Sequence, residues 1–441
     1  MDINTKQLKK LGFVTTSAFV IANMVGTGVF TSLGYQLKDT DNLIAVLLVW
    51  VIGGVIALSG SLVYGELGAA MPRSGGEYHY LSKIYHPSIG FLSGWVSITV
   101  GFAAPVALAA MALGSYTTRV FPVLSSQSIA LSVLLVITFI HSLDVRLGGS
   151  FQNVLTSFNI LLILIFVICG LTLIPKFQEL TTASKSFSFN DIPNFFISLV
   201  YVTYAFSGWN ASAYIASEID QPQKIIPRSL LFSTLLVTVL YFFLNLTFLL
   251  TAPANELKGQ IEVGYISATK IFGPTGGGLM AMLISILLIS TISSMVFVGP
   301  RVSQVMGEDM KLLRFLSEKS QRGTPVYAIL LQFVISFFMI LTSTFESVLT
   351  YAGFTLNLVT FLTVLGLFIH RVKYKNIERP YKTWGYPVVP IIYLVIISSL
   401  LYFIVKERPY ESLMGFLTLL SGSIIYLINR WYEKKQSIIE N

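Results

Sequence analysis

The chain has 441 residues, of which 54% are hydrophobic and 11% are charged, with a net charge of +8 and a single cysteine. Soluble proteins carry about 25% charged residues, whereas here apolar residues recur in blocks of about 20, so the composition excludes a soluble protein and predicts an all-α membrane protein in a lipid bilayer. The lone cysteine excludes an internal disulfide and a metal cluster, and the positive charge follows the loops, so no nucleic-acid partner is expected.

Apolar runs between polar loops predict about twelve transmembrane helices, several of them long enough to require a tilt or a kink. Most of the 29 Lys and Arg residues fall on one side of this topology, which predicts that both termini are cytoplasmic. The predicted spans lie near residues 12–36, 43–70, 88–116, 127–143, 150–174, 193–217, 228–252, 265–299, 325–343, 345–369, 387–405 and 410–432.

The first predicted span is interrupted by Gly26-Thr27-Gly28. A break there frees backbone N–H groups where no water can satisfy them, and N–H groups at a helix N-terminus bind an anion such as a carboxylate. On this interpretation the N–H groups of Thr27 and Gly28 hold a carboxylate, and the carbonyls of Ala22 and Asn23 face an ammonium group. The alternative is that Gly26 and Gly28 are small residues that let two helices pack closely.

Charged loop residues next to the second, sixth and eighth spans suggest a gate. Arg73 lies in the glycine-rich loop after the second span, Glu218 closes the sixth span and Arg301 closes the eighth. Opposite charges at the cytoplasmic mouth would form ion pairs that break when the protein opens inward. The alternative is a set of solvated loop charges that only orient the protein in the membrane.

The sixth predicted span carries a second interruption, Phe206-Ser207-Gly208-Trp209-Asn210. Unwinding near Ser207 and Gly208 frees the carbonyls of Tyr204, Ala205 and Phe206, which can accept hydrogen bonds from an ammonium group. One set of donors and one set of acceptors fits the two ends of an α-amino acid. The rings of Tyr204 and Phe206 would close over the ligand, or else they are ordinary packing aromatics.

Five spans separate the two interruptions, so the sequence predicts an inverted repeat. Paired broken helices in corresponding positions point to a transporter site. The predicted repeats cover residues of about 11–174 and 193–370 within a transporter core of residues 1–385. Residues 386–441 would add two further helices and a cytoplasmic tail.

The eighth predicted span contains a cluster of hydroxyl side chains: Ser290, Thr291, Ser293 and Ser294. Hydroxyls in membrane helices usually bond back to their own backbone. The sharper hypothesis pairs Ser293 and Ser294 with the carbonyls of Ala22 and Val25 as ligands of a Na⁺ ion, and Ser290 is a further ion-coupling candidate.

The central parts of predicted spans 1, 3, 5, 6, 8 and 10 contain no Asp, Glu, Lys, Arg or His. A site for a charged side chain would usually place a counter-charge there, so we expect a substrate with a neutral side chain. A carboxylate in the site would instead favour a polyamine or cationic amino acid antiporter. The four histidines lie near span ends without a nucleophile or a ligand set, so no enzyme is expected.

Several motifs occur in a fixed order and together resemble the amino acid–polyamine–organocation (APC) transporter superfamily, especially its L-type amino acid transporter branch. The resemblance covers roughly residues 10–380 and implies the leucine-transporter fold, with two inverted five-helix repeats and alternating access around a central site. It also implies that Gly26, Thr27 and Gly28 bind the carboxylate, that Tyr204 is an aromatic gate, and that Ala205 and Phe206 accept from the amino group. The motifs are Val25-Gly26-Thr27-Gly28-Val29-Phe30, Tyr64-Gly65-Glu66-Leu67-Gly68, Pro72-Arg73-Ser74-Gly75-Gly76-Glu77-Tyr78, Gly94-Trp95-Val96-Ser97 and Ala205-Phe206-Ser207-Gly208-Trp209-Asn210.

Two positions depart from that family pattern. Asn159 stands where many members carry a lysine in the fifth span, which leaves open whether Na⁺, H⁺ or exchange drives transport. The loop from Arg119 to Ser128 lacks the cysteine that links eukaryotic L-type members to a heavy chain, so we expect a self-sufficient prokaryotic transporter with no disulfide-linked partner.

The sequence therefore predicts a multi-pass transporter of neutral L-amino acids in the plasma (inner) membrane, working by alternating access as an exchanger or an ion-coupled symporter. No cofactor is expected besides a coupling Na⁺ or H⁺. The alternatives are a polyamine or cationic amino acid antiporter and a membrane amino acid sensor that binds without transporting.

Overall fold

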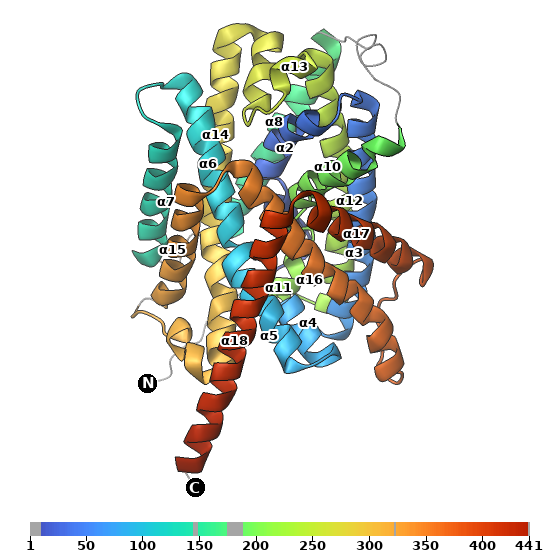
Figure 1. The fold of residues 1–441 in the computed structure, drawn as a ribbon, viewed down its shortest axis with the longest axis vertical. Coiled ribbons are helices and arrows are strands. Elements are labelled where there is room, and N and C mark those ends of the chain that lie inside the picture. The colour runs from blue at the N-terminus through green and yellow to red at the C-terminus, as the bar shows by residue number, and fades with distance from the viewer. Residues whose placement is uncertain (1–9, 144–148, 174–187, 322, 440–441) are drawn as a thin grey trace.

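The computed structural model describes residues 10–143, 149–173, 188–321 and 323–439, and every regular element in these ranges is a helix (Figure 1). Ten of the helices are long and apolar enough to cross a membrane. The predicted all-α membrane fold is confirmed. The predicted terminal tails, at residues 1–9 and 440–441, and the last residue of the fifth predicted span, residue 174, lie outside the described residues.

The helices follow one another with short connections. In the first half they are α1 (Phe13–Met24), α2 (Thr27–Asp39), α3 (Leu43–Ala70), α4 (Glu77–Ile84), α5 (Pro87–Val96), the π-helix η1 (Ser97–Gly101), α6 (Ala103–Val120), α7 (Ser126–Leu143), α8 (Gly149–Leu173), the 3₁₀ helix η2 (Phe189–Asp191) and α10 (Ile192–Ala205). In the second half they are α11 (Ala211–Tyr214), η3 (Ala216–Glu218), α12 (Pro222–Thr251), α13 (Ala254–Leu257), α14 (Val263–Asp309), η4 (Lys311–Ser317), α15 (Val326–Thr342), α16 (Phe345–Lys373), α17 (Val388–Glu407) and α18 (Pro409–Ile439).

The predicted spans agree with these helices to within a few residues at most boundaries. The largest difference is at α14, which runs ten residues past the predicted end at 299. Its bend is at Gly273, whose φ of +76° is not helical. Helix α18 runs past its predicted end at 432 to Ile439. Helix α12 begins before its predicted start at 228, at Pro222, because a proline fits the first turn of a helix, where its missing N–H has no partner to lose.

Helices in equivalent positions of the two predicted repeats pack against each other. In the central part of the molecule α3 lies along α12, α6 lies along α14, and α2 lies beside α10 (Figure 1). These pairs correspond to spans 2 and 7, 3 and 8, and 1 and 6. This pairing supports the inverted repeat, whose boundaries remain a prediction.

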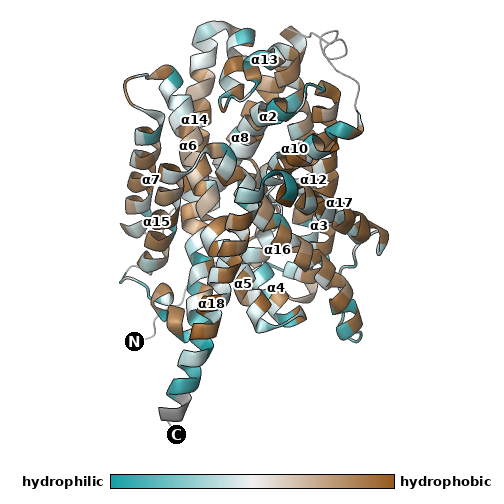
Figure 2. Cartoon of the chain, in the orientation of Figure 1, coloured by the Kyte–Doolittle hydropathy of each residue, from teal (hydrophilic) through white to brown (hydrophobic). Residues whose placement is uncertain are grey.

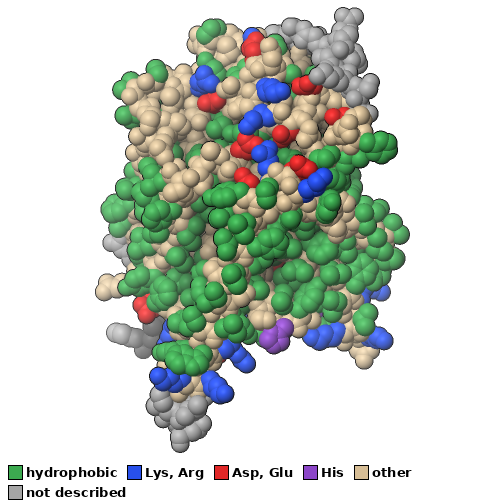
Figure 3. Space-filling view, in the orientation of Figure 1, with side chains coloured by type: hydrophobic (Ala, Val, Ile, Leu, Met, Phe, Trp, Pro, Cys, Tyr) green, Lys and Arg blue, Asp and Glu red, His purple; other side chains and the backbone are tan. Residues whose placement is uncertain are grey.

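The outer surface is apolar around the middle and charged at both ends. Large exposed hydrophobic side chains lie along α7, α8, α15, α17 and α18, and Figure 2 shows the peripheral helices coloured mainly as hydrophobic. In Figure 3 a hydrophobic belt separates an upper region of mixed charges from a lower end where Lys and Arg predominate. An apolar belt of this kind faces lipid in a membrane protein.

Candidate functional site

The predicted break in the first span is present between α1 and α2. The backbone leaves the helix at Val25 (ψ 90°) and Gly26 (φ −140°, ψ −144°), and α2 starts again at Thr27. Gly26 offers no side chain to cap α2, and the first N–H groups of a helix have no partner within it. These groups, at Thr27 and its neighbours, form what we call the carboxylate seat, with the positive end of the α2 dipole behind it.

The second break separates α10 from α11, with Gly208 at φ +96° in the turn. The prediction was that the carbonyls at this break are free, but two of them accept hydrogen bonds from N–H groups within the turn. Tyr204 O accepts from the Ser207 N–H (2.8 Å), and Phe206 O accepts from the Trp209 N–H (3.4 Å). A carbonyl oxygen has two lone pairs, so each can still accept one further hydrogen bond from an ammonium group.

The two breaks lie directly against each other. A Cβ atom built on Gly28 would lie 2.4 Å from Ala205 Cα, and one built on Gly208 would lie 2.4 Å from Asn23 O. Gly28 therefore allows α2 and α10 to pack closely, which is the alternative role that small residues can have in membrane helices. A Cβ on Gly26 would instead meet the side chain of Thr291 of α14, with Cγ2 at 3.3 Å, so Gly26 packs tightly but less so than Gly28.

Tyr241 of α12 ties both breaks together. Its buried hydroxyl contacts Met24 O at 2.6 Å and Ala205 O at 3.2 Å, so one side chain holds the end of α1 beside the end of α10. We expect Tyr241→Phe to lower the free energy of unfolding by about 1–3 kcal/mol, because it leaves buried carbonyls unsatisfied. A parallel rise in KM for transport would show that the relative position of the breaks sets affinity.

The free energy of unfolding is measured by denaturation and KM by uptake kinetics. The control variant is Tyr402→Phe, in which an exposed tyrosine undergoes the same chemical change. Equal stability and equal KM in the two variants would contradict a bridging role for Tyr241.

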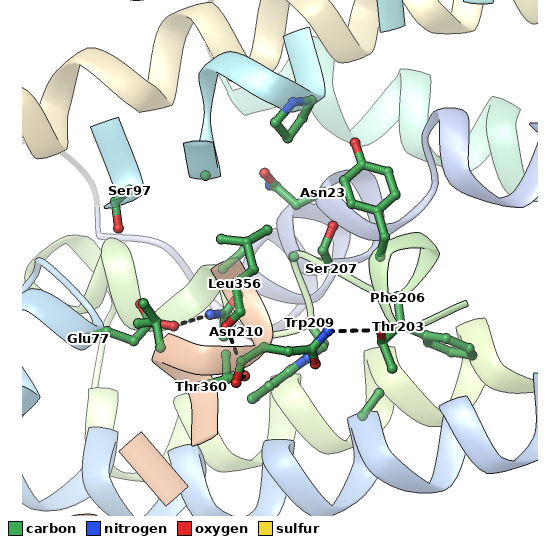
Figure 4. Close-up of a pocket in the computed structure, with 18 of the residues that line it drawn as sticks. Asn23, Glu77, Ser97, Thr203, Phe206, Ser207, Trp209, Asn210, Leu356 and Thr360 are labelled. Carbon is green, nitrogen blue, oxygen red and sulfur yellow. Dashed lines mark hydrogen bonds between the residues drawn. The ribbon is translucent and has the colours of Figure 1, made fainter. Parts of the chain in front are cut away.

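A central cavity opens beside the two breaks, with an empty volume of about 1010 Å³ that includes its part open to solvent. The rest of its wall comes from helices α3, α4, α5, α6, α14, α16 and α17 and from the π-helix η1, and π-helical turns are frequent at functional sites. Figure 4 shows Asn23 and Ser207 facing this space. The lining residues from the two broken spans are Phe19, Asn23, Thr203, Tyr204, Phe206, Ser207, Gly208, Trp209, Asn210, Ala211 and Tyr214.

The cavity therefore brings together half of the predicted substrate-binding residues. Asn23, Tyr204, Phe206, Ser207 and Gly208 line it. The others form the adjoining layer and do not line the described cavity; they are Val25, Gly26, Thr27, Gly28 and Ala205. The predicted roles of both groups stay predictions.

Sequence reasoning missed a carboxylate in the cavity wall. Glu77 opens α4, in the loop after the second span, and only 2% of it is exposed. It lines the cavity beside Asn210 (Figure 4), so the expectation that the site holds no carboxylate is wrong. The turn at Gly75 (φ +116°) and Gly76 (φ +52°) folds this loop residue inward, and those two glycines were the signal available in the sequence.

The ion-coupling candidates do not meet as expected. Ser293 bonds His141 of α7 (Oγ–Nε2, 2.7 Å), whereas Thr291 faces Gly26. Side chains two positions apart on an α-helix, such as Thr291 and Ser293, point in directions about 200° apart. Because Thr291 faces the first break, Ser293 points away from the Ala22 and Val25 carbonyls. The Na⁺ hypothesis therefore loses Ser293 as a ligand and stays a prediction for Ser294, while Ser290 is a partly buried residue of α14.

Asn159 of α8 is buried, and its Oδ1 atom has no hydrogen-bond partner in the described part of the chain. An unsatisfied buried amide oxygen can accept from a proton donor or bind a cation. Its predicted connection to ion coupling remains open.

The gate candidates form pairs at the lower end of the molecule. Arg301 contacts Glu218 at 3.1 Å and lies 4.2 Å over the Phe297 ring, while Arg73 lies 3.8 Å from Asp309. These side chains are largely exposed, so such pairs contribute only about 0–1 kcal/mol and can break readily. Their opening as a gate is a prediction.

His79 is a neighbour of this cluster, whereas the remaining gate candidate, Tyr204, lies elsewhere. In α4, burial, together with Arg73 and Lys83, lowers the pKa of His79 to about 4, so His79 adds no positive charge at neutral pH. The fourth gate candidate, Tyr204, is 4% exposed and lies close enough to Thr27 for their side chains to interact. It thus stands beside the carboxylate seat, away from the charged cluster.

Comparison with known proteins gives a consistent result. The family described as amino acid permease matches residues 11–426. The chain is 28% identical to human b(0,+)-type amino acid transporter 1 over 440 residues, covering 97% of this chain and 89% of that protein. It is 27% identical to mouse large neutral amino acids transporter small subunit 2 (97% and 82% covered) and to mouse Asc-type amino acid transporter 1 (98% and 83% covered).

Proposed function

The chain belongs to the amino acid permease family, and from this premise we propose that it transports neutral L-amino acids by alternating access. It is a multi-pass membrane protein and an amino acid transporter, not an enzyme. The specific substrate and mechanism argued below are our proposal.

The observation that best supports this proposal is the contact between the two helix breaks. The N–H groups at the start of α2 suit the carboxylate of an α-amino acid, and the carbonyls at the ends of α1 and α10 suit its ammonium group. Contact between Gly208 and Asn23, and between Gly28 and Ala205, keeps these two sets a few ångströms apart. A zwitterion needs both sets, so the backbone alone can match it without a charged side chain.

Apart from the Glu77 carboxylate, the rest of the cavity suits a neutral substrate side chain. Its wall beside the breaks is contributed largely by apolar residues, including Ile56, Ala57, Met295, Val298 and Leu356. Burying an apolar side chain against such a wall is favourable by about 25 cal/mol per Å². The charged pairs lie away from the breaks, at the ends of the helices.

For the transport cycle, we propose that the Glu218–Arg301 and Arg73–Asp309 pairs close the cytoplasmic side and separate on inward opening. The end of α18 lies toward the lower end in Figure 1, where Lys and Arg predominate in Figure 3, and Leu11, near the start of the described chain, bonds Glu218. This arrangement supports cytoplasmic termini by the positive-inside rule. We place the protein in the plasma membrane without a disulfide-linked heavy chain. Exchange, Na⁺ coupling and H⁺ coupling are the three driving modes to distinguish.

Uptake into proteoliposomes tests this proposal. We expect labelled neutral amino acids to enter vesicles that contain the purified protein, and varying internal amino acid, Na⁺ and pH in turn identifies the driving mode. Saturable binding with no uptake under any condition would overturn transport and support a sensor.

A single substitution tests the carboxylate seat. We expect Gly26→Leu to lower affinity for neutral amino acids at least tenfold, because its Cβ would already lie 3.3 Å from Thr291 Cγ2 and the rest of the side chain would crowd the seat. Binding is measured by ligand-dependent thermal stabilisation. Gly278→Leu is the control, since a Cβ there meets nothing within 4 Å. Unchanged affinity in Gly26→Leu would assign Gly26 to packing alone.

A further inference from the structure

Glu77 occupies an unusual position for a carboxylate. Its Oε1 atom accepts hydrogen bonds from the Tyr64 hydroxyl (2.8 Å) and from Asn210 Nδ2, and Tyr214 lies close to the same group. Its Oε2 atom is buried and has no hydrogen-bond partner among the described residues. No Lys, Arg or His of the described chain forms an ion pair with it.

This arrangement is costly unless a cationic group binds there. An ionised carboxylate away from water needs a partner charge or hydrogen bonds to both oxygens. The two side chains on Oε1 donate to it, which leaves Oε2 as the oxygen without a donor. The residue lines the central cavity, so a ligand there lies beside Glu77, and a small movement of the covering side chains would expose Oε2 to it.

The carboxylate stands within reach of a long substrate side chain. Asn210, which contacts Glu77, is two residues beyond Gly208, and two residues span at most about 7 Å. The side chains of lysine and arginine extend over a comparable length. Apolar residues such as Val96, Met295 and Val298 form the wall that their methylene stems would cover.

We propose that Glu77 binds the positively charged end of a basic amino acid side chain and so sets the selectivity of the cavity between basic and neutral substrates. The proposal rests on the proposed function, since it places the α-carboxylate and α-ammonium groups at the two breaks. A basic side chain fits better than a bare monovalent cation, because such an ion needs a ring of several oxygens in place of its hydration shell and Glu77 has one free oxygen.

The test compares substrates of one shape and different charge. In proteoliposomes, unlabelled L-arginine should inhibit labelled L-leucine uptake at least tenfold more strongly than L-citrulline, its neutral isostere. Glu77→Gln should lower the ratio of arginine to citrulline inhibition at least tenfold. Tyr64→Phe is the matched control, because it removes a hydrogen bond to Glu77 but keeps the carboxylate, and its ratio should stay near that of the wild type.

Each contrary result has a distinct meaning. Leucine uptake with equal inhibition by arginine and citrulline in the wild-type protein would overturn this inference and leave the proposed function intact, whereas absence of any amino acid uptake would overturn the proposed function. A Glu77→Gln variant that lost dependence on Na⁺ or on a pH gradient, with an unchanged arginine to citrulline ratio, would overturn the inference in favour of ion coupling. If Glu77→Gln does not fold, the wild-type comparison of the two isosteres still decides the outcome.

Discussion

Gly208→Ala is expected to reduce transport at least tenfold. Gly208 adopts φ +96°, which costs a residue with a side chain about 1–3 kcal/mol, and its new Cβ would lie 2.4 Å from Asn23 O. The contact between the two breaks would have to open, which moves the carbonyls that we propose to bind the ammonium group away from the proposed carboxylate seat. A factor of ten corresponds to about 1.4 kcal/mol, which strain alone can supply.

Two matched glycine substitutions separate the causes of that loss. Gly323 shares the positive φ (+81°) but borders open space, so Gly323→Ala reports backbone strain without a collision. Gly278→Ala adds a methyl group to open space where φ is not positive. Initial rates of uptake are compared at equal protein density. If Gly208→Ala transports as fast as Gly323→Ala, contact between the breaks is not needed for transport.

Glu66→Gln is expected to lower the free energy of unfolding by about 3–5 kcal/mol, because it leaves two partly buried arginine charges without their fully buried partner. The Glu66 side chain is fully buried and accepts two hydrogen bonds from Arg371, at 2.9 and 2.6 Å. Arg379 lies 3.5 Å from the same carboxylate, and the Thr383 N–H donates to it at 2.8 Å. The group thus joins α3 to the end of α16 and to the loop before α17.

Unfolding in a denaturant titration measures this effect, with Glu256→Gln as the control. Glu256 pairs with Lys270 at 2.9 Å, but both side chains are more than 40% exposed, so its loss should change stability by about 0–1 kcal/mol. A Glu66→Gln variant as stable as Glu256→Gln would show that the buried cluster does not anchor the loop.

The candidate site shows where reasoning from local sequence succeeds. Gly26 and Gly208 predicted both breaks correctly, because glycine weakens a helix. Glycine alone does not break one, since Gly53 and Gly54 lie within the unbroken α3. The charged residues Glu218 and Arg301 were expected to pair, and they do, because each closes a span whose end faces the same side of the membrane.

The same reasoning failed where a contact depends on another helix. Tyr241 carried no motif, yet it joins the two breaks because α12 packs beside α1. Ser293 was grouped with the first span although its helical register turns it toward His141. Glu77 was placed in a loop because it lies between predicted spans, and only the inward turn at Gly75 and Gly76 brings it to the cavity.

By itself, the sequence determined the membrane class, the approximate spans and the two helix breaks. These follow from composition and local periodicity, because a lipid environment obliges each span to satisfy its own backbone hydrogen bonds. Only the tertiary structure showed which side chains line the cavity, such as Glu77, and which residue joins the two breaks, namely Tyr241. Such contacts depend on helix rotation and on loop turns, which change which side chains meet without changing the apolar pattern that marks a span.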